Sequence, residues 1–209
     1  MNKWLLTAAI LVAIVLFAAD HAYVCKYCGE TFSSANGVRT GYCLYSGNKK
    51  HAAISASGTF VCQYCGEKFS YPTGVRTSYC LYSENHKHVL SGGEGSGKFV
   101  CRFCGEKFSS ARLVSTGYCI YSSNHKHQLA GQTDEKQSCF CQYCGEKFSS
   151  PSSIRNGHCL YSENHKHSLS SVTDGNFFCK YCGEKFSYSL GVKNGYCLKN
   201  EKNHKHCLP

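Results

Sequence analysis

Several features of larger proteins are missing from this sequence. No stretch outside its repeated segments is long enough to form a separate catalytic domain. The one long apolar run, residues 4–19, is shorter than the ~20 residues that span a bilayer comfortably. Acidic residues are also few, 13 Asp and Glu against 23 Lys and Arg. These absences disfavour an enzyme and direct attention to the repeats.

Cysteine is abundant, with 17 residues, and 15 of them belong to a unit that recurs five times. Two residues separate the first two cysteines, and fourteen more separate the second from the third. A histidine follows after seven further residues, or after eight in the fifth unit. The spacing predicts one four-ligand metal site per unit. The predicted ligands are Cys25, Cys28, Cys43 and His51; Cys62, Cys65, Cys80 and His88; Cys101, Cys104, Cys119 and His127; Cys141, Cys144, Cys159 and His167; and Cys179, Cys182, Cys197 and His206.

The number of cysteines per unit favours zinc over disulfides. A segment of this size needs a metal, disulfides or a partner to fold. Three cysteines are an odd number, so disulfides within one unit would always leave one thiol over. Three thiolates and one imidazole instead complete a tetrahedral Zn²⁺ shell, so we expect about five structural Zn²⁺ ions per chain. Cys139 and Cys207 lie outside the pattern and could pair with each other or remain thiols.

Bound zinc would also change the charge of the protein. The formal net charge of +10 counts every thiol as neutral. A zinc-bound thiol is deprotonated, so fifteen thiolates and five Zn²⁺ ions would lower the net charge to about +5. A charge of this size supports solubility and weak attraction to anionic surfaces, and it does not require a nucleic-acid partner.

The first 22 residues predict a signal peptide or a signal anchor. Lys3 precedes the apolar run and Asp20 follows it, which favours export of the repeats. No clean small-x-small cleavage site is present, because Phe17 stands three residues before a cut after Ala19. We therefore expect a secreted or extracytoplasmic protein, anchored to the membrane by its N-terminus if this segment is not cleaved.

Each unit is expected to fold as a hairpin followed by a short helix. In the second unit, residues 60–61 and 67–69 predict two strands around the first ligands, with Gly66 at the positive φ of a tight turn. In the fourth unit, Ser150 can cap a helix that starts at Pro151 and ends at Gly157. Repeated apolar residues would form a small core: Phe32, Phe69, Phe108, Phe148 and Phe186, and Val38, Val75, Val114, Ile154 and Val192.

The pattern F-x-C-x2-C-G-x2-F-x5-V, which begins at Phe60 in the second unit, resembles the first half of a C2H2-type zinc finger. That resemblance implies a ββα unit around one zinc. It stops after the helix, because Ser78 stands where such fingers have their first histidine and the third ligand is Cys80. The full repeat is also similar to tandem CxxCG repeat proteins of bacteria.

The resulting prediction is a small metal-stabilised α+β protein of five tandem ββα-like modules arranged as beads on a string. Modules are expected at 23–51, 60–88, 99–127, 139–167 and 177–206. Polar segments rich in Gly or Ser join them at 52–59, 89–98, 128–138 and 168–176, and these predict flexible linkers.

The choice of histidine follows from the first unit. Lys49 holds the earlier position there, so only His51 remains, and a shared geometry selects the later histidine in every unit. The earlier histidines are expected either as exposed turn residues or as alternative ligands: His86, His125, His165 and His204.

The leading hypothesis is an exported, non-enzymatic protein whose modules bind a macromolecule, a protein or a cell surface, through several weak contacts. Nucleic-acid binding is an alternative, suggested by Arg39, Arg76, Arg155 and Lys193 near the helix ends. Helix-start positions with mostly Ser, Pro, Ala and Thr disfavour it. A second alternative is extracytoplasmic zinc buffering, although closed sites rarely release metal. Thiol redox catalysis is disfavoured because no βαβ pattern surrounds the CxxC pairs.

Overall fold

The computed structural model describes residues 23–55, 60–92, 98–133, 138–172 and 175–209. The predicted signal or anchor segment, 1–22, lies outside these residues. Within the described ranges, no helix combines the length and the apolar character that a membrane crossing requires. The described ranges form five small modules of one plan.

Each module has a hairpin of two short antiparallel strands, as predicted. In the second module Phe60 pairs with Phe69 and Val61 with Lys68. In modules 1 and 3 a third strand joins the first, giving the orders β2-β1-β3 and β7-β6-β8. The strands are β1 (Tyr23–Cys25), β2 (Thr31–Phe32), β3 (Ala53–Ser55), β4 (Phe60–Val61), β5 (Lys68–Phe69), β6 (Lys98–Cys101), β7 (Lys107–Phe108), β8 (Leu129–Thr133), β9 (Cys139–Phe140), β10 (Lys147–Phe148), β11 (Phe177–Phe178) and β12 (Lys185–Phe186).

The helix predicted in each module is instead a short 3-10 helix of five residues, so the ββα expectation needs correction. Ser150 precedes the fourth helix but makes no capping hydrogen bond through its side chain. Pro151 does occupy the first position. Gly157, with φ +89°, then turns the chain toward Cys159, which leaves no room for further helical turns. The helices are η1 (Ala35–Arg39), η2 (Pro72–Arg76), η3 (Ala111–Ser115), η4 (Pro151–Arg155) and η5 (Ser189–Lys193).

Apolar contacts within and between modules form the core. The five predicted Val and Ile positions are buried, with 2–4% of their surface exposed. One cluster joins Tyr23 of module 1 to Phe140 of module 4 and to Phe178 and Leu208 of module 5. Another joins modules 1 and 2. Burial across module boundaries therefore supplements the small core of each unit.

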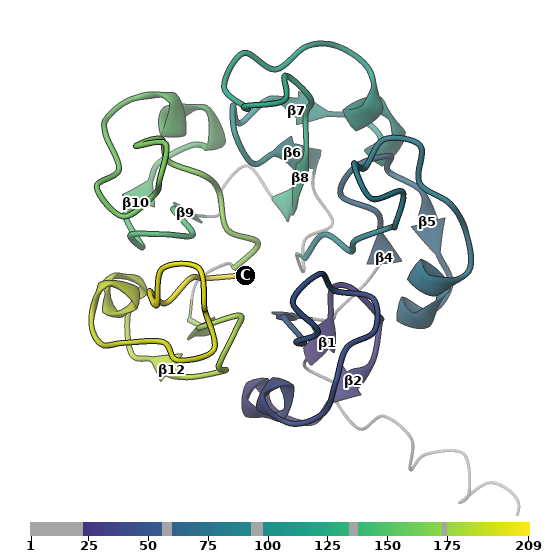
Figure 1. Cartoon of the computed structure of the whole chain (residues 1–209). Helices are drawn as coiled ribbons and strands as arrows, with labels where there is room; N and C mark the ends of the chain where they lie inside the picture. Colours follow the sequence, from purple (N-terminus) through teal and green to yellow (C-terminus); the bar gives the residue numbers. More distant parts are fainter. Residues whose placement is uncertain (1–22, 56–59, 93–97, 134–137, 173–174) are drawn as a thin grey trace, which may run out of the picture.

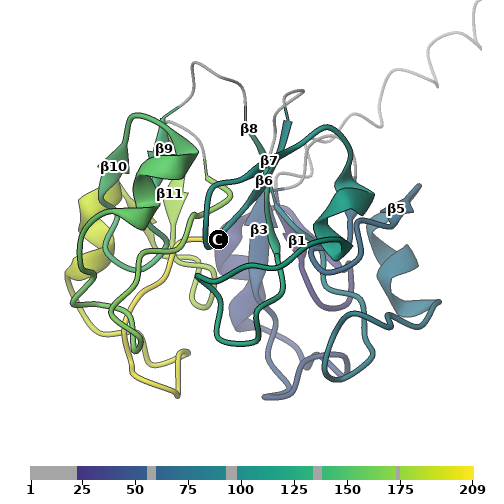
Figure 2. The ribbon, with the colours of Figure 1, turned by 90° about the horizontal axis from the view of Figure 1, so that it is seen from above.

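The modules are arranged in a closed ring (Figure 1). The 3-10 helices lie at the periphery, and β1, β4, β6 and β9 lie nearer the axis. Each module contacts the next in sequence, and module 5 contacts module 1. A view from the side shows that the loops leading from the third cysteine to the histidine lie toward one face of the ring, the lower one in Figure 2.

One contact between neighbouring modules requires glycine. Gly105 follows the second cysteine of module 3 with φ +68°, and a Cβ atom there would lie 2.0 Å from the carbonyl oxygen of Pro151 in module 4. The same close approach, 2.0–2.1 Å, recurs around the ring. Gly183 of module 5 meets Ala35 of module 1 in this way, so the interface closes the circle. The predicted positive φ of Gly66, +70°, is also observed.

Arginine side chains strengthen this interface. The guanidinium Nε of Arg155 in module 4 donates a hydrogen bond to the carbonyl oxygen of Cys104 in module 3. Arg76 makes the equivalent bond from module 2 to module 1, and Arg39 makes it from module 1 to module 5. Three of the basic residues near the helix ends therefore hold the ring together.

These contacts correct the prediction of beads joined by flexible linkers. Every predicted linker has buried residues within its first two positions, as in Ala52–Ser55, Val89–Ser91 and Leu129. In module 1, the N–H of Ala53 donates to the carbonyl oxygen of Lys180 in module 5, at 2.8 Å. Polar composition suggested solvent-exposed tethers, but backbone groups can pair whatever side chains they carry.

Candidate metal centres

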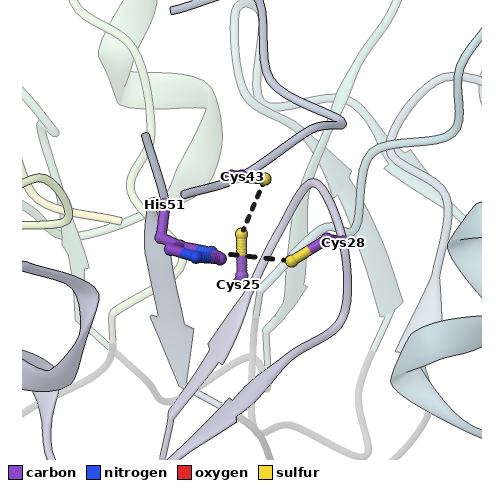
Figure 3. A group of neighbouring side chains, drawn as sticks. All are labelled: Cys25, Cys28, Cys43 and His51. Atoms are coloured by element: carbon purple, nitrogen blue, oxygen red, sulfur yellow. Dashed lines mark hydrogen bonds between the residues drawn. The ribbon is translucent and has the colours of Figure 1, made fainter. Parts of the chain in front are cut away.

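The structure brings together all twenty predicted ligands in five separate groups. In each group three cysteines and the later histidine place their ligand atoms within 4.8 Å of one another. Figure 3 shows Cys25, Cys28, Cys43 and His51, which come from β1, the turn after it, and the loop before β3. Every member is buried except Cys65, which is half-buried.

The distances match a tetrahedral zinc shell. With Zn–S of about 2.3 Å and Zn–N of about 2.0–2.1 Å, two sulfurs should lie about 3.8 Å apart, and sulfur and nitrogen about 3.6 Å apart. The Sγ atoms of Cys25 and Cys43 are 3.9 Å apart, and equivalent pairs in three other sites are 3.8–3.9 Å apart. Sulfur-to-Nδ1 distances are 3.5–3.7 Å in all five sites. None of these fifteen cysteines forms a disulfide.

The histidine geometry identifies Nδ1 as the metal-facing nitrogen. In the first site, Nδ1 of His51 faces Cys28, while Nε2 lies 3.5 Å from a carboxylate oxygen of Glu30. The carboxylate-to-Nε2 distance is 3.3–3.5 Å in the other four sites. Metal-bound histidines commonly direct their second nitrogen to a carboxylate, which fixes the tautomer and the ring orientation.

Sequence reasoning missed these five glutamates. Each directly follows the glycine after the second cysteine, so the repeated string C-G-E carried the signal: Glu30, Glu67, Glu106, Glu146 and Glu184. They remain half or more exposed on the side chain in four of the sites. They therefore orient the histidine from the edge of the site.

The predicted core phenylalanines also position the ligands. The ring of Phe108 packs edge-on against His127, with ring centres 5.3 Å apart. The other four pairs of this kind are 5.1–5.3 Å apart. Packing from one side and the carboxylate from the other leave the imidazole little freedom to rotate.

The earlier histidine lies outside the ligand group. His125 has a left-handed backbone, φ +58°, and its ring stacks on Tyr118 with centres 4.7 Å apart. Its carbonyl oxygen accepts a hydrogen bond from the N–H of Cys119, which closes the loop. The equivalent histidines stack on Tyr79, His158 and Tyr196. In module 1, Lys49 takes this position and places its ammonium over Tyr42.

The three sulfurs of a site differ in acidity. In the third site, the hydrogen bond with Cys101 lowers the pKa of Cys104. A hydrogen bond with the same residue raises the pKa of Cys119. The sulfurs therefore do not all ionise readily on their own, whereas a bound divalent cation would favour three thiolates.

A pair of substitutions in module 3 tests the histidine assignment. Loss of a hydrogen-bonding partner of a metal ligand lowers metal affinity by ~10–100-fold. His127→Ala removes the ligand itself, so we expect it to lower the metal affinity of this site by more than that. His125→Ala should leave all five metals bound, because its ring lies on Tyr118. Native mass spectrometry during chelator titration would count the ions retained. Loss of one metal from the His125 variant alone would contradict the assignment.

Comparison with known protein families, with curated proteins and with solved structures finds no match to this chain. The class of this protein is therefore inferred from its five repeated ligand groups alone. The five Cys3His groups could bind five structural metal ions, consistent with a zinc-finger-like repeat protein. The modules differ from ββα fingers in their short 3-10 helices and in the loop that supplies the histidine.

Proposed function

We propose that the chain is an exported, non-enzymatic zinc protein whose ring presents five copies of one contact surface to a protein or cell surface. Zinc suits these sites because three thiolates and one imidazole in a tetrahedral arrangement match its preferred ligands. Four protein ligands leave no coordination position for water, which supports a structural rather than a catalytic metal.

Repeated exposed side chains beside the third cysteine carry this proposal. The cysteine points into the module, and the residues before and after it point outward. The aliphatic member is 65–75% exposed in every module, and the four tyrosines are 61–64% exposed. We call them the exposed pairs: Tyr42 and Leu44, Tyr79 and Leu81, Tyr118 and Ile120, His158 and Leu160, and Tyr196 and Leu198.

The exposed pairs have features of a contact surface. They flank the third cysteine, where the loop to the histidine begins. These loops lie toward one face of the ring, the lower face in Figure 2. Stacking between Tyr79 and His86, with ring centres 4.6 Å apart, holds the aromatic ring in place. Rigid aromatic groups lose little entropy when they bind, and tyrosine is enriched at interfaces. An exposed aliphatic residue and an exposed aromatic residue therefore recur together beside the third cysteine in four of the five modules, which supports a repeated contact surface.

The ring changes how multivalency would operate. Flexible tethers would let each module seek its own contact, whereas packed modules offer five contacts at fixed spacing. Avidity is largest when the spacing of the sites matches that of the partner. The proposed partner is therefore a repetitive or multimeric surface on which several exposed pairs can bind at once.

Two further observations favour this function over its alternatives. Arg39, Arg76 and Arg155 are engaged by neighbouring modules, which weakens the case for nucleic-acid contacts through the helix ends. The metal groups are buried and form part of the core, which weakens the case for releasable, buffering zinc.

The test is binding of the zinc-loaded full chain to intact cells of the organism that makes it. We expect replacement of Leu44, Leu81, Ile120, Leu160 and Leu198 by serine to weaken binding at least about tenfold, and replacement in one module to have a smaller effect. A matched control replaces Leu113 and Leu190, exposed leucines of η3 and η5, by serine. Equal binding by all variants, or no binding by the unaltered chain, would overturn the proposal.

A further inference from the structure

One position in each module lies on a belt of backbone hydrogen bonds around the ring. It is the residue directly after the first cysteine. Its N–H donates within its own module, at 2.8–2.9 Å, and its carbonyl oxygen accepts an N–H from the following module, at 2.8–2.9 Å. The carbonyl of the residue in module 5 accepts from Ala53 of module 1, which closes the belt. We call these the belt residues: Lys26, Gln63, Arg102, Gln142 and Lys180.

The belt residues are polar in every module although the belt lies inside the ring. Gln63 and Gln142 are each 3% exposed, Lys180 is 6% exposed and Arg102 is 8% exposed. Burial of such groups costs free energy unless they are paired, so an ordinary core would place apolar side chains here. Long polar side chains at five equivalent positions, four of them buried and Lys26 half-buried, indicate a polar site on the axis.

Three of the belt residues carry cationic side chains, and none has a carboxylate partner among the described residues. The Lys180 ammonium donates to the side-chain oxygen of Gln142 at 3.4 Å. Nε of Arg102 donates to the carbonyl oxygen of Leu129 at 3.4 Å. The belt joins Lys180 to module 1, where Lys26 holds the equivalent position, and Arg102 holds it in module 3.

Tyrosines and a cavity adjoin Lys180, the belt residue of module 5. The residue after the belt position is tyrosine in four modules, and the ammonium of Lys180 lies 5.2 Å from the ring centre of Tyr181. A cavity of about 380 Å³ is lined by Lys180, Tyr143, Tyr181, Lys205 and Cys207. Lys202 and Glu163 also line it and pair with each other at 2.7 Å. A second cavity shares Tyr181 and Lys202 with it and extends to Tyr27 of module 1.

We propose that the ring axis binds one multiply charged oxyanion, a free phosphate or the phosphoryl group of a small molecule, between Arg102, Lys180 and Lys26. The planar guanidinium offers paired donors that match phosphate oxygens, and the ammonium groups add charge. Buried Gln63 Oε1, which has no hydrogen-bond partner in the described residues, could accept from a protonated phosphate oxygen. A bound anion would also relieve the repulsion among the three cations.

Isothermal titration of the zinc-loaded full chain with inorganic phosphate, at constant ionic strength set by chloride, tests this proposal. We expect one saturable site per chain and an increase in the unfolding temperature with phosphate. Arg102→Gln should weaken phosphate binding at least about tenfold, because it removes charge-assisted hydrogen bonds. Arg112→Gln, an exposed arginine of the same module, is the control and should change affinity less than about twofold.

Phenyl phosphate separates the two sources of the anion. Tighter binding of phenyl phosphate than of inorganic phosphate would identify a phosphorylated small molecule, since the tyrosines can contact its ring. Equal affinities would identify free phosphate. Lys180→Gln provides a second variant with the same expected loss if the Arg102 variant does not fold. Absence of saturable binding at millimolar phosphate, or equal losses in the Arg112 control, would overturn the proposal.

Discussion

Removal of the metal with a strong chelator is expected to unfold all five modules together. Structural zinc sites contribute about 10–16 kcal/mol each in isolated fingers, as much as the whole stability of a typical domain. Modules of this size have too little core to remain folded without it. Because a single apolar cluster joins modules 1, 4 and 5, loss of one module should also destabilise its neighbours.

Circular dichroism and a thiol titration would follow the unfolding. Chelation should abolish the near-ultraviolet signal of the tyrosines and make all fifteen ligand thiols reactive. Addition of zinc to the reduced chain should restore both. The control is the same chelator saturated with zinc beforehand, which should have no effect. Retention of the folded spectrum after complete metal removal would contradict a structural role.

Alanine at Gly105 is expected to open the ring at the junction of modules 3 and 4. A left-handed backbone costs a non-glycine residue about 1–2 kcal/mol, and overpacking adds about 1–3 kcal/mol. The new Cβ would lie 2.0 Å from the backbone oxygen of Pro151, which a side-chain rotation cannot relieve. We therefore expect Gly105→Ala to lower the free energy of unfolding by about 2–5 kcal/mol.

Gly47→Ala is the matched control, because a Cβ atom at Gly47 would meet nothing within 4 Å. Its effect should stay within about 0.5 kcal/mol. Urea unfolding of the zinc-loaded proteins gives the free energies, and small-angle scattering gives the size. An expanded Gly105→Ala chain that still binds five metals would show that the ring, and not the sites, has opened. If Gly105→Ala left the free energy of unfolding and the size of the chain unchanged, the proposed role of this contact in closing the ring would be wrong.

The residues with the clearest periodicity could be interpreted from the sequence. The twenty ligand positions recur at fixed spacing, and chemistry leaves few uses for three cysteines and a histidine. The hairpin in each module followed from the same logic, because Gly66 and the strand residues flank the first two ligands. The choice between two histidines depended on a single difference, Lys49 in the first unit.

The ring could not be predicted because its contacts leave little trace in side-chain patterns. The belt consists of backbone groups, such as the N–H of Leu129 and the carbonyl of Gln63, which any residue could supply. From the sequence, the glycine after the second cysteine is explained by its positive φ alone. The structure shows that Gly105 is also needed because the backbone of Pro151 approaches it closely. The belt position itself alternates among Lys, Gln and Arg, a pattern typical of solvated surface.

Native mass spectrometry of the chain purified without chelators or reductants tests the central claim most directly. A mass increase that corresponds to five zinc ions, with no disulfides among the ligand cysteines, is the predicted result. A chain that carries no metal and whose CxxC pairs are oxidised to disulfides would contradict it.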